Sequence, residues 1–537
     1  MNSIPAKKIL LALMSGLLIT ASFPPLKTDW LIWVSIIPLL ISIEGTSPWV
    51  AFKLGILAGL AHFLSLIYWI INVLNIYGGL DIFTSIFILL LLCLYLSIYM
   101  GIFSSLVSIF RHSHIKIFLF AGIWVSLEYI REFIFTGFPW GLLGYSLYHR
   151  LTIAQVADIT GVYGLSFFIV AFNVFIFQVI VGFKGIFKNR FFISETLILF
   201  ILACAYIIYG NNCLARYNDK IPEGSGLNIA IIQGNIDQAV KWNTDFQEKT
   251  LDKYIDLTRS SLHTKPDIII WPETAVPLFF QDKDPLSEEL EAFIKECRTN
   301  FIFGSPSYKI DRGTVRYYNT AWDISPEGEI KGQYNKNHLV PFGEYVPFQQ
   351  YLPFVHRLVP AAGDFSRGDS TDPLLLGKIP AGILICYEVI FPEIARHQVL
   401  KGARLIINIT NDAWFGFTSA PYQHLFMSVF RAIENRRPLL RSANTGISAV
   451  IDSRGQVIKH GDLFTEEVIT ARISTGENTL TFYTRFGDIF ASGILILCLI
   501  KIFVELCYSR KKKRNEQLDR VHPETRIFGQ GQGTRRL

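Results

Sequence analysis

The amino-acid sequence predicts a polytopic α-helical membrane domain of about eight spans, joined to an extracytoplasmic α/β domain. Two observations predict this fold class. Hydrophobic residues make up 51% of the chain and charged residues only 18%, whereas an average soluble domain is about 25% charged. The apolar residues gather before Tyr209 and near the C-terminus, while from Leu227 onward short buried strands alternate with amphipathic helices.

Long apolar runs account for the predicted spans. A helix needs about 20 apolar residues to cross a bilayer. The first two runs are shorter, so we expect tilted spans or a helical hairpin that does not fully cross. The first run also fits a cleaved signal peptide, but the Phe-Pro-Pro sequence after it is a poor cleavage site. The runs are Ile9–Phe23, Leu31–Ile43, Val50–Leu74, Ile82–Phe110, Ile117–Phe135, Val162–Phe183, Phe191–Tyr209 and Phe486–Tyr508.

The basic residues predict the orientation of these spans. If the N-terminus is cytoplasmic, the clusters that contain Lys7, Arg111 and Lys184 all lie in the cytoplasm, as does Arg510–Arg514. This agrees with the positive-inside bias of membrane proteins. The chain is therefore predicted to comprise a membrane domain of about seven spans (1–210), an extracytoplasmic domain (211–484), a C-terminal transmembrane helix (485–508) and a basic, disordered cytoplasmic tail (509–537).

The polar region is predicted to form one α/β domain whose helices cover its sheets. Its roughly 270 residues are enough for a separate core. Buried strands are expected at Leu227–Gly234, Asp267–Trp271, Phe301–Gly304, Tyr318–Ile324, Ile383–Cys386, Leu405–Thr410 and Ser448–Asp452. Helices are expected at Phe246–Leu262, Leu286–Thr299 and His424–Asn435.

Charge and cysteine content argue against several kinds of partner. The net charge of +6 is most concentrated in the tail beside the last span. There it suits topology and anionic lipid, so no nucleic-acid partner is needed to explain it. The seven cysteines show no paired spacing, no C-x-x-C and no zinc pattern. We therefore expect no disulfide framework, no metal site and no cofactor.

Two aromatic segments do not fit the pattern of strands and helices. They are the long connection Val340–Pro373 and the Gly-containing turn Asn411–Ala420. Long connections are usually functional or disordered, and the first is too aromatic for disorder. The aromatic side chains either pack into a core or, beside a membrane, present an apolar surface to lipid.

Three polar residues point to a catalytic site. Glu273, Lys336 and Cys386 each come at or after the end of a predicted strand. Because the C-terminal ends of strands in an open α/β sheet converge on one crevice, we expect the three side chains to meet. Taken singly, Glu273 and Lys336 fit a surface ion pair, and Cys386 fits a buried structural thiol. Their shared placement at strand ends favours the catalytic interpretation.

A carboxylate, an ammonium and a thiol form a coherent set for acyl transfer. A free cysteine has a pKa of about 8.5, so little thiolate is present near neutrality. A nearby cation lowers that pKa, and a carboxylate accepts the thiol proton. The ammonium, or backbone N–H groups at the turn after Cys386, can stabilise the tetrahedral oxyanion.

The motifs around these residues resemble the nitrilase, or carbon–nitrogen hydrolase, superfamily. Glu273 lies in IIIWPETAVP, Lys336 in YNKNHLVPFGEYVP and Cys386 in ICYEVIFPE. The resemblance is closer to one membrane branch, the apolipoprotein N-acyltransferase family. The features that select it are the HLVPFGEYVP segment, the TGFPWGLLGYS loop (Thr136–Ser146) and the spans on both sides of the polar domain.

The resemblance implies a two-step reaction in a nitrilase-like αββα sandwich. Cys386 would take an acyl chain from a phospholipid, forming a thioester. The α-amino group of a diacylglyceryl-modified N-terminal cysteine on a bacterial apolipoprotein would then take the acyl chain. The implied location is the bacterial inner membrane, with the catalytic domain on the periplasmic side.

The resemblance also implies roles for particular residues. These are Glu273 as general base, Lys336 as oxyanion partner, Cys386 as nucleophile, Glu344, Tyr387 and Glu388 as supporting residues, and Trp242 at the substrate entrance. In addition, the aromatic connection itself suggests that Phe342, Tyr345 and Phe348 govern how lipid and acceptor reach the site.

Two alternatives remain open at this stage. A membrane-anchored amidase or nitrilase acting on a small amide would use the same three residues, although the number of spans favours a lipid substrate. A transporter would be supported by charges within the membrane, and Glu128, Arg131 and Glu132 lie near the end of one run. Their spacing lets them pair on one helical face, so we expect a structural salt-bridge cluster there.

Overall fold

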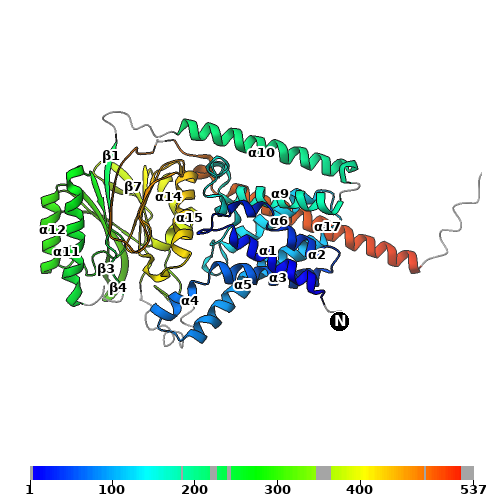
Figure 1. The fold of residues 1–537 in the computed structure, drawn as a ribbon, viewed down its shortest axis with the longest axis horizontal. Coiled ribbons are helices and arrows are strands. Elements are labelled where there is room, and N and C mark those ends of the chain that lie inside the picture. Colours follow the sequence, from blue (N-terminus) through cyan, green and yellow to red (C-terminus); the bar gives the residue numbers. More distant parts are fainter. Residues whose placement is uncertain are drawn as a thin grey trace, which may run out of the picture.

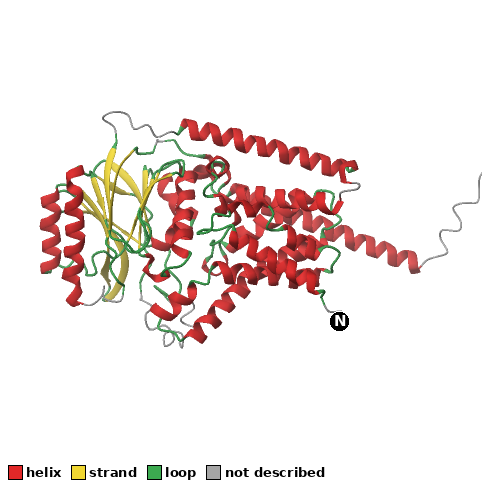
Figure 2. Ribbon diagram, viewed as in Figure 1, coloured by secondary structure: helices red, strands yellow, loops and turns green. Residues whose placement is uncertain are grey.

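The computed structural model describes residues 4–182, 186–217, 226–238, 244–345, 365–476 and 479–521. Figures 1 and 2 show a bundle of helices at one end of the molecule and two β-sheets with flanking helices at the other. The N-terminus lies at the end of the bundle that is remote from the sheets (Figure 1). Two predicted site residues, Trp242 and Phe348, fall outside the described residues.

The bundle is built mainly from the N-terminal part of the chain. Its helices are α1 (Ala6–Ala21), α2 (Ile37–Ile43), α3 (Pro48–Leu66), α4 (Ile70–Asn72), α5 (Ile82–Ile109), α6 (Lys116–Arg131), α7 (Leu151–Ala154), α8 (Ala157–Thr160), α9 (Val162–Gly182), α10 (Arg190–Arg216), α16 (Phe482–Phe486) and α17 (Ile489–Val521). Among the described residues, 4 helices are long and apolar enough to cross a membrane, namely α3, α5, α9 and α10. The total of about eight spans stays a prediction.

Some of the predicted runs do not form single helices. The run Val50–Leu74 divides, because α3 ends at Leu66 and the chain continues through α4 and a π-helical turn at Val73–Tyr77. The run Leu31–Ile43 forms a 3₁₀ helix (Asp29–Trp33) and the short α2. With 5 and 7 residues at about 1.5–2 Å per residue, the 3₁₀ helix and α2 are both too short to cross a hydrocarbon core of about 30 Å.

The first helix relates to the alternative of a signal peptide, and the last helix to the predicted disordered tail. Helix α1 packs on α3, where Gly16 lets the backbone of Ala58 approach too closely for any side chain. The segment with signal-peptide features is thus part of the bundle core in this structure. Helix α17 continues to Val521, so residues 509–521 of the predicted disordered tail are helical. The Lys, Arg, Glu and Gln residues of this segment are good helix formers, which explains the difference.

In the rest of the chain, the described residues form two six-stranded sheets. The first has the strand order β12–β1–β2–β3–β4–β5 and the second has the order β11–β10–β9–β8–β7–β6. Strands β1 to β3 are mutually parallel, as are β7 to β9. The strands are β1 (Leu227–Gln233), β2 (Ile268–Ile270), β3 (Asn300–Asp311), β4 (Thr314–Ile324), β5 (Ile330–Asn335), β6 (Leu374–Leu376), β7 (Ile379–Ile385), β8 (Leu405–Thr410), β9 (Leu439–Ala443), β10 (Ala449–Ile451), β11 (Val457–His460) and β12 (Glu467–Ile473).

Five of the strands were not predicted, and their positions and sequences explain why. Four of them, β5, β6, β11 and β12, form the outer edges of the two sheets. An edge strand is partly solvated, and β5, β11 and β12 lack the continuous apolar run that marks a strand buried on both faces. Strand β6 consists of three leucines and is too short to stand out. The fifth, β9, is central, but Arg441 and Ser442 interrupt its apolar pattern.

The two sheets pack face to face. The apolar layer between them includes Ile270 from the first sheet and Ile407 from the second. Among the described residues, each outer face carries two helices. They are α11 (Thr244–Ser261) and α12 (Pro285–Cys297) on the first sheet, and α14 (Pro392–Leu400) and α15 (Ala420–Asn435) on the second. The domain is therefore an αββα sandwich, with α14 and α15 between the second sheet and the bundle (Figure 1).

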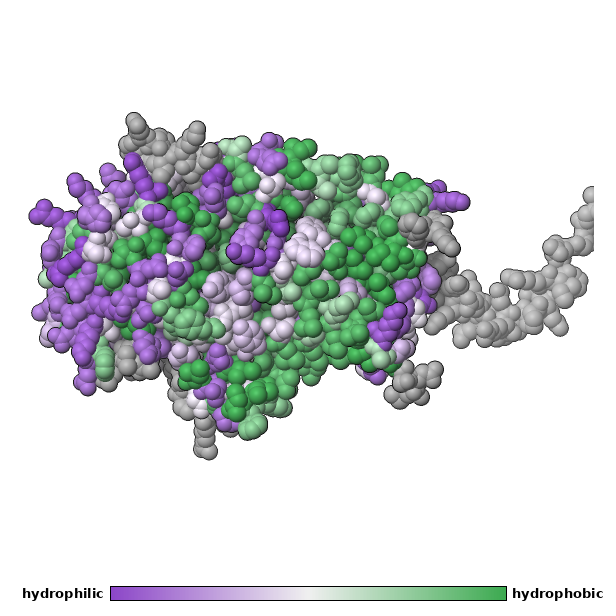
Figure 3. Space-filling view, viewed as in Figure 1, coloured by the Kyte–Doolittle hydropathy of each residue, from purple (hydrophilic) through white to green (hydrophobic). Residues whose placement is uncertain are grey.

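Helix α15 joins the sandwich to the bundle. Arg436, at its C-terminal end, pairs with Asp158 of α8 at 2.6 Å. Within the helix, Arg431 donates to the Tyr145 hydroxyl at 3.0 Å. Figure 3 shows hydrophilic side chains gathered over the sandwich and hydrophobic ones over the bundle. This division fits a sandwich that lies in water and a bundle that lies in lipid.

Candidate active site

Cys386 lies at a sharp turn at the end of β7. It opens the short 3₁₀ helix Cys386–Ile390 and has a φ of +53°. A non-glycine residue in this region costs of order 1–3 kcal/mol and persists only where its surroundings impose it. The thiol is buried, and the next side chain, Tyr387, packs edge-on against Phe391 at 5.2 Å. The predicted strand-end cysteine thus occupies the kind of strained elbow that presents a nucleophile.

Glu388, two residues further on, holds this turn in place. Its Oε2 atom accepts the backbone N–H of Ile385 at 2.8 Å. Its Oε1 atom accepts those of Asn337 and His338 at 2.6 and 3.0 Å, and the Tyr334 hydroxyl lies 3.1 Å from both oxygens. Burial raises the pKa of Glu388 to about 7. This carboxylate ties the end of β7 in the second sheet to the segment that follows β5 in the first.

Lys336 lies between two carboxylates. Its Nζ atom is 2.9 Å from Oε1 of Glu344 and 3.7 Å from Oε1 of Glu273. The Asn319 amide donates to the same two oxygens, at 2.9 Å for Glu344 and 2.8 Å for Glu273. Burial alone would lower the pKa of Lys336, but the charges of Glu344 and Glu273 outweigh it and raise the pKa. Lys336 is therefore a buried cation that its partners keep charged.

The thiol of Cys386 shares this electrostatic environment. Burial and the charge of Glu273 raise its pKa, and Lys336 offsets them only in part. Lys336 lowers the pKa of the thiol, as predicted for a nearby cation, but burial and the charge of Glu273 outweigh this effect. The cost of desolvating the thiolate exceeds its attraction to Lys336. The thiol is protonated at rest, so nucleophilic attack requires a base.

Glu344 lies on a tight turn together with two of the predicted substrate-binding aromatics. Its Oε2 atom accepts the Val340 N–H at 2.8 Å. In the same turn, the Phe342 N–H donates to the Tyr345 carbonyl at 2.8 Å. The Phe342 side chain is exposed, and Tyr345 is half-buried. The turn thus carries Phe342 and Tyr345 next to Glu344 in the chain, while their role in substrate binding stays a prediction.

Two residues that were not predicted hold Glu273. Asn319 donates to its Oε1 atom, and the backbone N–H of Asn411 donates to Oε2 at 2.9 Å. Asn411 follows β8 directly, so the strand-end argument that identified Glu273 would have identified Asn411 and Asp412 as well. Asn319 lies inside β4, where the sequence carries no comparable signal.

A second polar cluster lies on the α15 side of Cys386 and consists of Asp412, His424 and Arg441. Nε2 of His424 is 3.2 Å from the Cys386 carbonyl oxygen, and Nδ1 is 3.0 Å from Oδ1 of Asp412. Arg441 lies 2.7 Å from Asp412 Oδ2. Burial and the charge of Arg441 lower the pKa of His424. The cluster is therefore a neutral histidine beside a buried carboxylate–guanidinium pair.

The Thr136–Ser146 loop connects the bundle to this cluster. The indole N–H of Trp140 donates to Gln423 at 2.7 Å. The Trp140 ring stacks on the His424 ring, with 5.9 Å between centroids and an interplanar angle of 28°. The next residue, Gly141, has a φ of +73° and approaches Leu66 too closely to carry a side chain. The loop therefore requires glycine where it passes α3.

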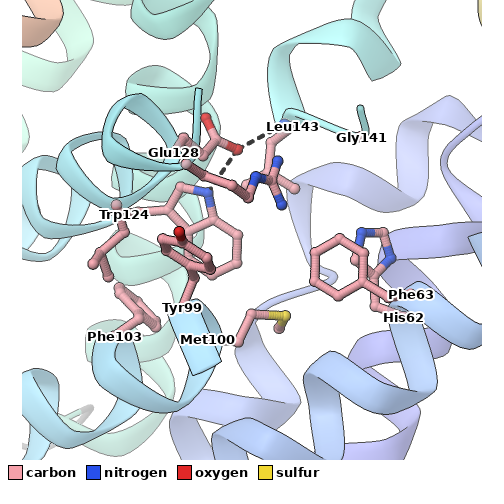
Figure 4. Close-up of a pocket in the computed structure, with 11 residues that line it drawn as sticks. His62, Phe63, Tyr99, Met100, Phe103, Trp124, Glu128, Gly141 and Leu143 are labelled. Atoms are coloured by element: carbon pink, nitrogen blue, oxygen red, sulfur yellow. Dashed lines mark hydrogen bonds between the residues drawn. The ribbon is translucent and has the colours of Figure 1, made fainter. Parts of the chain in front are cut away.

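A pocket in the bundle adjoins the same loop (Figure 4). Glu128 lies at its wall and accepts the indole N–H of Trp124 and the backbone N–H of Leu143, both at 2.9 Å. His62 and Tyr99 also line this pocket. The carboxylate therefore anchors the loop to α6 through a backbone hydrogen bond.

The salt-bridge cluster predicted for Glu128, Arg131 and Glu132 is wrong. Each of these described residues binds a partner outside the group. Arg131 donates to the Trp140 carbonyl at 3.3 Å, and Glu132 accepts the Tyr163 hydroxyl. The reason is that the loop and neighbouring helices bring donors and acceptors that helical spacing alone does not reveal.

Comparison with known proteins identifies the family. Residues 15–175 match the model described as "Apolipoprotein N-acyltransferase N-terminal domain", and residues 228–481 match "Carbon-nitrogen hydrolase". The protein named "Apolipoprotein N-acyltransferase" from Geobacter metallireducens is 43% identical over 493 residues, which are 91% of this chain and 94% of that relative. The chain belongs to the apolipoprotein N-acyltransferase family. The predicted family is confirmed.

A second relative supports the same family, whereas one solved structure is only distantly similar. The apolipoprotein N-acyltransferase of Haemophilus influenzae is 32% identical over 505 residues, 91% of this chain and 94% of its own. The crystal structure of a carbon-nitrogen hydrolase from Helicobacter pylori covers 47% of this chain and 89% of that one, at 20% identity and a TM-score of 0.36, which is too distant to support an argument. With its apolar helices and these relatives, the chain is a multi-pass membrane protein of the apolipoprotein N-acyltransferase family.

Proposed function

We propose that the chain transfers an acyl chain from a membrane phospholipid to the α-amino group of the diacylglyceryl-modified N-terminal cysteine of bacterial apolipoproteins. The meeting of Glu273, Lys336 and Cys386 at one buried site carries this proposal. Relatives named for the activity match nine-tenths of the chain. The alternative of a membrane-anchored amidase is less supported, because the bundle itself matches the N-acyltransferase model.

In the first half-reaction, Glu273 takes the proton of the Cys386 thiol, and the sulfur attacks the ester carbonyl carbon of the phospholipid. The carbonyl oxygen becomes an oxyanion, which the Lys336 ammonium stabilises. Collapse of the tetrahedral intermediate breaks the ester C–O bond, and Glu273 returns the proton to the leaving alkoxide. A lysophospholipid departs, and a thioester remains on Cys386.

In the second half-reaction, the acceptor amine attacks the thioester carbonyl carbon. Glu273 takes a proton from the attacking nitrogen, and the oxyanion again lies beside Lys336. Collapse breaks the C–S bond, and the proton returns from Glu273 to the sulfur. The products are an amide and the free thiol, so the site is ready for another phospholipid. Glu344 and Asn319 keep the cation and the carboxylate in place throughout.

The same proposal places the sandwich on the periplasmic side of the bacterial inner membrane. The distribution of basic residues supports this side, because the loops that carry them would lie in the cytoplasm. The docking of α15 on the bundle keeps the site close to the bilayer, where both lipid substrates reside. Phe342 and Tyr345, with Trp242 and Phe348, would guide these substrates to Cys386.

Labelling with a phospholipid that carries a tagged acyl chain tests the proposal. The purified chain should acquire the tag on the peptide containing Cys386, through a bond that neutral hydroxylamine cleaves. Addition of a diacylglyceryl-modified peptide should move the tag to its N-terminal amine. A chain in which Cys213 and Cys297 are both replaced by alanine should label normally. Absence of label on Cys386 in the unaltered chain would contradict the proposal.

A further inference from the structure

The carbonyl group of Cys386 is fixed by a residue outside the three catalytic candidates. Nε2 of His424 lies 3.2 Å from that carbonyl oxygen. A carbonyl oxygen only accepts hydrogen bonds, so Nε2 carries the hydrogen and donates it. Nδ1 of the same ring lies 3.0 Å from Asp412 and 2.9 Å from Arg441. All three side chains are at most 1% exposed, so the imidazole has little freedom to turn.

This hydrogen bond also sets the direction of the following N–H group. The peptide bond between Cys386 and Tyr387 is trans. A planar trans peptide points its C=O and its N–H in opposite directions. The carbonyl is directed toward α15, on the outer side of the second sheet, so the Tyr387 N–H is directed away from α15. Lys336 and Glu273 lie on that opposite side, because the first sheet carries them.

We propose that His424 is a positioning residue for acyl transfer. By holding the Cys386 carbonyl, it aims the Tyr387 N–H at the oxyanion that forms on the acyl carbon. The proposal rests on the acyl transfer proposed above. The Tyr387 N–H and the Lys336 ammonium then approach the same oxygen from two directions, which is how donors stabilise a tetrahedral intermediate. The hydrogen bond also helps to maintain the positive φ of Cys386.

Residues of the helix bundle also help to hold His424 in place. The Trp140 ring packs against one face of the imidazole, and its N–H is bound by Gln423. The Asp412–Arg441 pair holds the Nδ1 edge. The bundle therefore contributes to the geometry of the nucleophile turn through the Thr136–Ser146 loop.

Two amide substitutions separate the two hydrogen bonds of His424. In His424→Gln, the amide nitrogen is as many bonds from Cβ as Nε2, so it can still donate to the Cys386 carbonyl. In His424→Asn, the amide matches only the Nδ1 position, so it can reach Arg441 and Asp412 but not the Cys386 carbonyl. The measurement is the first-turnover acylation of Cys386 by p-nitrophenyl butyrate in detergent. We expect a loss of about 10²–10³ in rate for His424→Asn and a loss within about tenfold for His424→Gln.

Alkylation of Cys386 by iodoacetamide is the control for misfolding. The sulfur displaces iodide from a methylene carbon and no oxyanion forms, so the reaction needs the thiol but not the Tyr387 N–H. We expect both variants to be alkylated at close to the unaltered rate, measured by mass spectrometry of the Cys386 peptide. Equal acylation of all three proteins would overturn the proposal. Parallel loss of acylation and alkylation in both variants would also overturn it, because His424 would then only support the fold.

The choice of ester keeps this test separate from the proposed function. A nitrophenyl ester acylates a thiol without lipid or lipoprotein, so the comparison of variants is valid whichever acyl donor the chain uses. Failure of phospholipid labelling in the unaltered chain would instead contradict the proposed function. The two failures are therefore distinguishable.

Discussion

The two sheets of the sandwich differ in what they contribute to the site and in what covers them. The first sheet carries the charged groups Glu273 and Lys336, and its covering helices α11 and α12 have exposed polar faces. The second sheet carries Cys386, and its covering helix α15 is buried against the bundle. The sheet that holds the nucleophile is therefore the one attached to the membrane part, while the sheet that holds Glu273 and Lys336 faces water.

This division of the site between two sheets indicates which substitutions should impair it. The thiol of Cys386 comes from the second sheet, whereas Glu273 and Lys336, its proposed base and cation, follow strands of the first. Glu388 bridges the two sheets through backbone N–H groups of both, and α15 fixes the second sheet to the bundle. Substitutions should therefore have effects that depend on whether they remove the chemistry, loosen the bridge between sheets, loosen the attachment to the bundle, or touch only the solvated face.

The largest effect is expected at the nucleophile of the second sheet. Cys386→Ala should abolish transfer, and Cys386→Ser should nearly do so, because an alcohol is a much weaker nucleophile than a thiol at neutral pH. Thioester formation from labelled phospholipid measures the effect. The paired replacement of Cys213 and Cys297 by alanine is the matched control. Appreciable turnover by Cys386→Ala would show that the second sheet does not supply the nucleophile.

The charged residues of the first sheet should come next. Glu273→Gln leaves the resting thiol protonated with no base, and Lys336→Ala removes a donor to the oxyanion. Loss of one such donor typically costs about 10²–10³ in rate. Both variants should therefore fail to accumulate thioester in an assay with labelled phospholipid. Full labelling of Glu273→Gln would contradict its assignment as the base.

Substitution of Glu388, which bridges the two sheets, should reduce thioester formation somewhat less. The activity of the unaltered chain should also depend on the protonation of Glu388. Glu388→Gln places an N–H₂ group against backbone donors, so the turn at Cys386 should shift and thioester formation should fall by about 10². Because burial raises the pKa of Glu388 to about 7, protonation below pH 7 should lower the activity of the unaltered chain for the same reason.

The free energy of unfolding should change with pH in the direction opposite to activity. The folded pKa of Glu388 lies above the unfolded value, so the folded state binds the proton more tightly. Its contribution to the free energy of unfolding therefore falls as pH rises from about 4.5 to about 7. Melting curves and thioester assays across this range would check both trends. A change with pH that persists unaltered in Glu388→Gln would assign the titration to another group.

Weakening the attachment of α15 to the bundle should lower the stability of the protein more than it changes the catalytic groups. Arg436→Ala leaves Asp158 buried without its 2.6 Å partner, and breaking such a pair costs about 3–5 kcal/mol. The melting temperature in detergent should fall, and the Arg436→Ala, Asp158→Ala double variant should recover part of the loss. An unchanged melting temperature for Arg436→Ala would show that the pair does not stabilise the attachment.

The smallest effect is expected on the solvated face of the first sheet. Lys331 pairs with Glu329 at 2.5 Å, and both side chains are largely exposed. Exposed pairs contribute little because water screens them. Lys331→Ala should leave the melting temperature and the rate of thioester formation unchanged. A clear loss of activity would mean that the first sheet meets a partner on this face.

Much of this protein was predictable from local sequence. The long apolar runs indicated a membrane part, and the strands buried on both faces were recognisable because they read as continuous apolar segments. The motifs around Glu273, Lys336 and Cys386 indicated the family, since the strand-end placement of a residue depends on its immediate neighbours. Strands β5, β11, β12 and β9 escaped prediction because partial solvation, or a buried arginine, removes that apolar signal, and β6 has only 3 residues.

The tertiary structure alone decided how the groups of the site act on one another. The net rise in the pKa of Cys386 depends on the depth of burial and on the distances to Glu273 and Lys336, and neither quantity is present in a strand-end motif. The contact of His424 with the Cys386 carbonyl joins residues 38 positions apart on different elements. Electrostatic and hydrogen-bond energies fall off with distance in space, so only the packed fold determines which of these groups interact.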